Sequence, residues 1–87
     1  MSTTNNDRLF HLGYVSTETG DLGTAGMLEL LTEARKINTS RGITGLLLHR
    51  ERSFYQVMEG SEDAVRQTFD SIEKDTRHKG IDVLFEG

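Results

Sequence analysis

Apolar and polar residues alternate near the start of the chain, and this pattern then gives way to a loop composition. Phe10, Leu12 and Tyr14 are separated by single small or polar residues, a period of two that predicts a strand over Leu9–Ser16. Tyr14 is expected on the same strand face as Leu12. The stretch Thr17–Gly26 is rich in glycine, threonine and acidic residues, which is typical of a loop.

The next segment has the spacing of an amphipathic helix. Thr24 is a candidate N-cap, because a threonine hydroxyl can accept a hydrogen bond from the first helical turn. The stripe on one helix face consists of Met27, Leu30, Leu31, Ala34 and Asn38. The charged residues Glu29, Glu33, Arg35 and Lys36 point elsewhere. Asn38 is therefore a polar amide on the face that is expected to be buried.

A hairpin is predicted after this helix. Gly42 suits a left-handed exit from the helix, and the apolar run Ile43–His49 predicts a central strand. Arg50–Ser53 is a short polar connection to a second strand over Phe54–Glu59. On that strand Phe54, Gln56 and Met58 share one face, and Tyr55 and Val57 lie on the other.

A second helix and a last strand complete the pattern. Ser61 is a good N-cap, and Glu62 and Asp63 suit the positive end of a helix dipole. The apolar stripe consists of Val65, Phe69 and Ile72. The polar turn Asp75–Gly80 leads into a β-branched strand over Ile81–Phe85. The order βαββαβ predicts an α+β, ferredoxin-like fold with two helices on one face of a mostly antiparallel sheet.

Length and composition add limits on the class of protein. A chain of 87 residues supports one hydrophobic core. Residues 1–8 are mostly small and polar, so we expect a disordered leader before a single domain over residues 9–87. Only 34% of the residues are hydrophobic, so a ligand that fills part of the core would help stability.

Charge, cysteine and histidine exclude several functions. The formal net charge is -4 with scattered Lys and Arg, which argues against a nucleic-acid partner. There is no Cys, and His11, His49 and His78 fall in three separate segments, so we expect no metal site. No apolar run is long enough to cross a membrane and no signal peptide is recognisable, so we expect a soluble cytoplasmic protein.

Two amides occupy positions that are expected to face the core. A buried amide without partners costs about 1 to 3 kcal/mol, so Asn38 and Gln56 imply a polar network or a polar ligand. Tyr14 would supply a third polar group on the same side. Spacing alone leaves open that the Asn caps helix carbonyls and that the Gln faces water.

Four segments together resemble one known family. They are Leu12–Ser16 (LGYVS), Asn38–Leu48 (NTSRGITGLLL), Phe54–Gly60 (FYQVMEG) and Asp75–His78 (DTRH). Their order and separations are similar to those of the BLUF domains, sensors of blue light using FAD, and the similarity runs from about residue 9 to residue 87. The resemblance implies a non-covalent FAD between the two helices, its ring against the sheet, and no reaction on a diffusible substrate.

The resemblance also implies a role for each matching residue. Tyr14 would hydrogen-bond Gln56, Gln56 would reach the flavin N5 and O4 edge, and Asn38 would hold the O4 and N3 edge. Blue light would make the flavin a strong oxidant, the tyrosine would donate an electron and a proton, and the glutamine would switch rotamer or tautomer. A rearranged hydrogen bond would then persist as the signal.

Three residues of the fourth segment have a less specific role. The resemblance places Asp75, Arg77 and His78 near the ribityl chain or the phosphates, where Arg and His can offset negative charge. A solvated turn is the competing interpretation of the same residues. No enzymatic or metal-binding role is expected for them.

The chain departs from the family pattern at three places. Family members continue through a fifth strand with an Arg-x-Phe segment and a Trp or Met near the flavin, whereas this sequence stops at Gly87. We therefore expect either a shortened chain or a degenerate domain with an unpaired sheet edge. Gly13 stands where the family usually has a bulky aliphatic residue, and Ile37 where a polar residue often precedes the Asn; both would loosen the pocket.

Two alternative functions stay open at this point. One is a degenerate BLUF-like interaction module without photoactivity. The other is an acylphosphatase-like hydrolase, which would need an Arg in the loop after the first strand, and Thr17–Gly23 contains none. For a sensor we expect a homo-oligomer or a downstream effector protein in trans, bound by the sheet face opposite the helices, where Leu9, Val15 and Tyr55 should lie.

Overall fold

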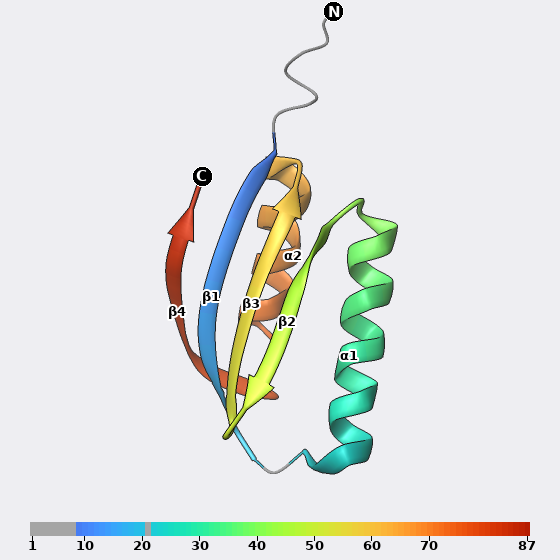
Figure 1. Cartoon of the computed structure of the whole chain (residues 1–87), viewed down its shortest axis with the longest axis vertical. Coiled ribbons are helices and arrows are strands. Elements are labelled where there is room, and N and C mark those ends of the chain that lie inside the picture. The colour runs from blue at the N-terminus through green and yellow to red at the C-terminus, as the bar shows by residue number, and fades with distance from the viewer. Residues whose placement is uncertain (1–8, 21) are drawn as a thin grey trace, which may run out of the picture.

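The computed structural model describes residues 9–20 and 22–87. The elements in chain order are β1 (Phe10–Glu18), α1 (Gly23–Ser40), β2 (Thr44–Arg50), β3 (Ser53–Gly60), α2 (Glu62–Glu73) and β4 (His78–Glu86). This is the βαββαβ order that the sequence predicts (Figure 1). The leader expected over residues 1–8 lies outside the described residues.

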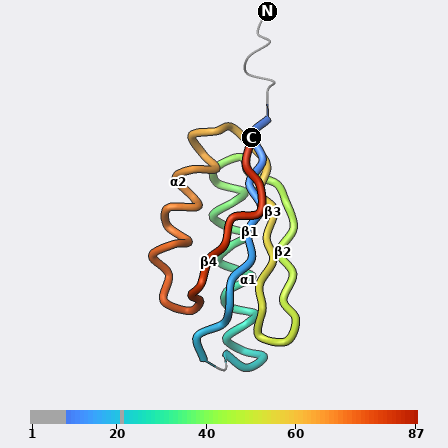
Figure 2. Tube along the Cα trace, turned by 90° about the vertical axis from the view of Figure 1, so that its left-hand side faces the viewer, coloured from blue at the N-terminus to red at the C-terminus, as the bar shows by residue number. Residues whose placement is uncertain are grey.

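The four strands form one antiparallel sheet in the order β2-β3-β1-β4. Both helices lie on the same side of it (Figure 2), with α2 behind β1 and β3 and α1 beside β2 (Figure 1). The ferredoxin-like α+β fold is therefore confirmed. Within the described ranges, no helix combines the length and the apolar character needed to cross a membrane.

The core lies between the sheet and α2. It is built from the buried side chains of Leu12, Tyr14, Ile43, Met58 and Val65. Leu12 pairs with Met58 and Tyr14 with Gln56 across β1 and β3, so the alternation of both strands places these side chains on the helix side. At the start of α2 the hydroxyl of Ser61 accepts a 3.2 Å hydrogen bond from the backbone N–H of Ala64, as the sequence predicts.

Helix α1 is attached to the rest of the domain less closely than α2. All of its residues are described, and none of its side chains is fully buried, whereas α2 buries Val65 and Thr68. The predicted Thr24 cap was wrong, because α1 begins at Gly23 and its N-cap position is Leu22, whose side chain makes no capping hydrogen bond. Instead, the Glu18 carboxylate accepts a 2.8 Å hydrogen bond from the backbone N–H of Leu22.

The hairpin connection and the helix exit match the prediction. Gly42 has a φ of 68°, in the left-handed region after α1. Glu51 and Arg52 form the tight turn between β2 and β3 with φ of 51° and 70°. Two left-handed residues are the conformation that lets a two-residue loop follow the twist of the strands.

Two strand predictions need correction. The run Ile43–His49 is not a central strand. Within residues 9–20 and 22–87, β2 pairs with β3 alone and forms a sheet edge, where Leu46 is 52% and Leu48 49% exposed. The last strand begins at His78 rather than Ile81, because His78 pairs with Glu18 of β1. Local composition does not report these pairings, since they depend on which strand lies alongside.

Candidate functional site

A largely apolar cavity lies between α1, α2 and the helix side of the sheet. It encloses about 660 Å³ of space, including the part that is open to solvent. The residues that the sequence proposes for the site all line it: Tyr14, Asn38, Gln56, Asp75, Arg77 and His78. Segments distant in the sequence therefore converge on one pocket.

A short hydrogen bond joins Tyr14 and Gln56 at the floor of the cavity. The two residues face each other in the β1–β3 register. The Tyr14 hydroxyl donates to Oε1 of Gln56 at 2.6 Å, and the two residues are only 3% and 4% exposed. Burial, with a smaller contribution from the charge of Asp75, raises the pKa of Tyr14, so the phenol keeps its proton and remains a donor.

The other half of the Gln56 amide is available to a ligand. Its Nε2 group makes no hydrogen bond within the described part of the chain, although Oε1 is taken by Tyr14. Among the described residues, no fully buried side-chain nitrogen or oxygen lacks a partner. Nε2 is therefore reached from the cavity that Gln56 lines.

Asn38 has the same property on the opposite wall. Its backbone carbonyl accepts hydrogen bonds from the N–H groups of Arg41 and Ile43 at 3.2 and 2.7 Å. Its side-chain amide makes no hydrogen bond within the described residues, and Asn38 lines the cavity. The main chain of Asn38, not its side chain, thus closes the helix end, which leaves the amide for a ligand.

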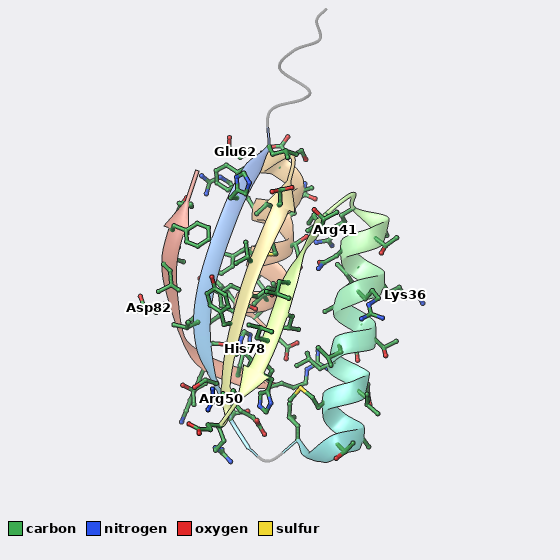
Figure 3. The ribbon with its side chains drawn as sticks, in the orientation of Figure 1. Lys36, Arg41, Arg50, Glu62, His78 and Asp82 are labelled. Carbon is green, nitrogen blue, oxygen red and sulfur yellow. The ribbon has the colours of Figure 1, made fainter. Side chains whose placement is uncertain are left out.

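His78 is fixed by two hydrogen bonds. Its Nε2 donates to the carbonyl oxygen of Ile72 at 2.8 Å, and its Nδ1 lies 2.7 Å from the hydroxyl of Ser16. Because the carbonyl can only accept, the neutral ring carries its proton on Nε2 and accepts from Ser16 on Nδ1. The ring also meets Phe54 edge-on at 6.0 Å between centroids, and the labelled side chain lies behind the strands on the helix side (Figure 3).

Arg77 is held by carboxylates on both sides of the cavity. Its Nε donates to both oxygens of Asp75 at 3.0 and 3.1 Å, and its two terminal nitrogens reach Glu33 of α1 at 3.3 Å each. Hydrogen bonding from Arg77 lowers the pKa of Asp75. The guanidinium is therefore already balanced by two negative charges.

Sequence reasoning missed several residues of the cavity wall. Glu33 was expected to point away from the apolar stripe, but it lines the cavity. A usable signal was the spacing of Leu30, Ala34 and Ile37, which brings Glu33 onto the same helix face. The polar wall from α2 consists of Thr68 and Ser71. Their position depends on how α2 packs on the sheet.

The residues present fit a flavin. Apolar walls suit an aromatic ring system. Nε2 of Gln56 and the side-chain amide of Asn38, which have no hydrogen-bond partner among the described residues, suit its polar edge. The Tyr14 ring, which lines the cavity, is supported from behind by a tilted contact with Phe69, 5.6 Å between centroids.

Comparisons with known proteins agree on one family. Residues 9–87 match the family described as sensors of blue light using FAD. The chain is 32% identical over 81 residues to the photoactivated adenylate cyclase subunit beta of Euglena gracilis, and 30% identical to that of Euglena longa, each match covering 93% of this chain. It spans only 9% of the length of either protein.

Solved structures give the same result. BlsA in its photo-activated state has a TM-score of 0.87 at 32% identity, covering 92% of this chain and 59% of that chain. BlrB, a BLUF protein in its dark state, has a TM-score of 0.85 at 31% identity, covering 93% and 61%. A bacterial light-regulated adenylyl cyclase has a TM-score of 0.86 at 29% identity, of which this chain covers 23%. The chain therefore belongs to the BLUF family, the sensors of blue light that use FAD.

Proposed function

We propose that the cavity between α1 and α2 is the FAD site and that Tyr14, Gln56 and Asn38 are its sensing contacts. The observation that carries the proposal is that the two ends of the Gln56 amide have different surroundings. Tyr14 occupies Oε1, while Nε2 has no partner in the described part of the chain and is reached from the cavity. Asn38 presents a second amide from the opposite wall, so a flavin edge would be held from both sides.

The protein supplies a proton donor and a reversible acceptor for the light response. When bound and excited by blue light, the flavin supplies a strong oxidant. Tyr14 is the buried phenol that can give up an electron, and its proton already points at Oε1 of Gln56. The Gln56 amide can reverse its orientation or shift its proton and stay hydrogen-bonded, because an amide both donates and accepts. We infer that this rearranged hydrogen bond is the signal.

Asp75, Arg77 and His78 would form the side of the cavity that receives the ribityl chain. Both nitrogens of the His78 ring are hydrogen-bonded within the protein, so this ring fixes the shape of the wall. The Asp75 carboxylate orients Arg77 by accepting hydrogen bonds from the Arg77 Nε and, at 2.9 Å, from the Arg77 backbone N–H. Neither Asp75 nor Arg77 needs to move a proton for the light response.

The experiment that tests this function is an absorption spectrum of the purified protein before and after blue light. A bound flavin with a reversible red shift is the expected result. A bound flavin without a shift would refute the Tyr14–Gln56 switch. A protein that takes up no flavin would refute the photoreceptor assignment and favour the degenerate interaction module.

We further propose that the domain senses light without catalysing a reaction and passes its signal to another protein in the cytoplasm. The partner would be a second copy of the chain or an effector in trans, as the light-regulated cyclases among the relatives suggest. The sheet face away from the helices is the proposed contact, because β2 and β4 expose Leu46, Leu48 and Phe85 there.

On that face Val15 and Tyr55 are cross-strand partners and only partly buried, and Leu9 is exposed. Light scattering of the dark and lit protein tests self-association. If both states are monomeric and Leu48→Lys leaves a light-dependent effector contact unchanged, this face is not the contact surface.

A further inference from the structure

Helix α1 forms one wall of the cleft but has no buried side chain to fix it. Side-chain hydrogen bonds link α1 and the C-cap residue that follows it to the opposite side of the cleft. Arg41, which Figure 3 shows where α1 ends, donates to the hydroxyl of Thr68 on α2 at 3.0 Å. Glu33, near the middle of α1, meets Arg77, which precedes β4.

The two residues of the Glu33–Arg77 pair are held differently: Arg77 is fixed by its own loop, whereas Glu33 moves with α1. Arg77 is fixed, because Asp75 accepts from its Nε and from its backbone N–H. Glu33 receives one hydrogen bond from each terminal nitrogen of Arg77, at 3.3 Å, in a fork arrangement. The side chains of Arg77 and Glu33 are 30% and 47% exposed, so the pair lies where the cavity meets solvent.

We propose that the Glu33–Arg77 ion pair is a clamp across the mouth of the cleft that slows release of the flavin. The inference rests on the proposed FAD site, because both residues line that cavity. The pair joins the loosely held wall to the firmly held one, and a ligand between them leaves only after the wall moves. When the Glu33–Arg77 ion pair breaks, the Arg41–Thr68 hydrogen bond stays in place, so only one side of the cleft opens.

The charges at the rim of the cavity favour the clamp over direct binding of a phosphate by Arg77. Arg77 contributes one positive charge and is matched by the two carboxylates of Asp75 and Glu33. A phosphate arriving there would meet a net negative cluster. A clamp acts equally on flavins with and without phosphate, whereas a phosphate contact acts only on FAD.

The test is the rate at which bound flavin is released by the Glu33→Gln variant. The substitution keeps size and removes the charge. Exposed pairs of this kind are worth up to about 1 kcal/mol, so we expect release to be about two- to fivefold faster. The rate is measured for FAD and for riboflavin by flavin fluorescence after dilution. The matched control is Glu29→Gln, the same change on an exposed residue of α1 that does not line the cavity.

Two further readouts show whether the charge pair itself is responsible. Added salt should raise the wild-type rate toward that of Glu33→Gln and leave the variant unchanged, because salt screens exposed charges. In an Arg77→Met background, Glu33→Gln should have no further effect. A change in helix stability alone would produce neither result.

Each outcome decides the proposal. Equal release from Glu33→Gln and wild type overturns the clamp but leaves the FAD site intact. Slower release of FAD alone overturns it in favour of repulsion between Glu33 and the phosphates. A wild-type protein that binds no flavin overturns both the site and the clamp. Faster release of both flavins, with loss of the salt effect, supports the clamp.

Discussion

The hydroxyl of Tyr14 donates a 2.6 Å hydrogen bond to Oε1 of Gln56 across the paired strands β1 and β3. This bond fixes which end of the amide faces the protein and which faces the cavity. Both residues are almost fully buried, so contacts within the protein define the orientation of the amide. A ligand therefore meets an Nε2 donor in a defined position.

Replacing Tyr14 with Phe should abolish the light-induced spectral shift and leave flavin binding in place. The ring is kept, but Oε1 of Gln56 loses its donor, which should lower the free energy of unfolding by about 1 to 3 kcal/mol. Spectra before and after illumination and urea denaturation measure the two effects. Tyr55→Phe is the matched control on the opposite face of the sheet. A full shift in Tyr14→Phe would contradict the proposed switch.

Filling the cavity should remove the flavin without unfolding the domain. Ala34 lines the cavity on α1, so Ala34→Phe places a ring in the space proposed for the cofactor. We expect flavin content to fall at least about tenfold, the equivalent of 1.4 kcal/mol in binding, with unchanged far-UV circular dichroism. Ala25→Phe, at an exposed position of the same helix, should keep the flavin. Normal flavin content in Ala34→Phe would place the binding site elsewhere.

Acidification should weaken the contribution of Asp75 to stability. Its pKa is lowered in the folded protein, chiefly by hydrogen bonding from Arg77, whereas an unfolded Asp titrates at about 3.9. The carboxylate thus stabilises the fold above about pH 4, and this contribution is lost as the pH falls through the folded-state pKa.

Thermal unfolding of wild type and Asp75→Asn between pH 7 and pH 3 measures this effect. We expect a constant difference in melting temperature at the upper end and a decreasing one below about pH 4. A difference that grows on acidification would show that the folded-state pKa of Asp75 is raised instead.

Two strand glycines should differ sharply in their tolerance of a methyl group. A Cβ on Gly45 would lie 1.9 Å from the backbone carbonyl oxygen of Val57, which the sheet holds in place. A Cβ on Gly13 would lie 2.4 Å from the ring of Phe85, a half-exposed side chain that can rotate away. We expect Gly45→Ala to cost about 3 kcal/mol or more and Gly13→Ala about 1 kcal/mol.

Urea denaturation of both variants measures these costs. The double variant Gly13→Ala, Phe85→Ala tests the reason for the smaller cost, because without the Phe85 ring the new methyl group should add little. Equal costs for Gly13→Ala and Gly45→Ala would contradict the proposed difference between a clash with fixed backbone and a clash with a movable ring.

Local patterns in the sequence predict most of the fold, because the period of two and the helical spacing report which side chains share a face. They place Tyr14 with Leu12, and Gln56 with Phe54 and Met58, as the structure does. The four family segments add the cofactor class and the six site residues, all of which line one cavity. Their contacts with a flavin stay predictions.

Only the tertiary structure decided which strand lies at an edge and what surrounds each charge. The apolar run in β2 predicts burial, yet its Leu46 and Leu48 are exposed, because none of the described strands pairs on the outer side of β2. The sequence predicts that Glu33 faces solvent. In the structure it pairs across the cleft with Arg77, which lies 44 residues later in the chain. Periodicity is a property of neighbours along the chain, whereas strand order and ion pairing depend on segments that only folding brings together.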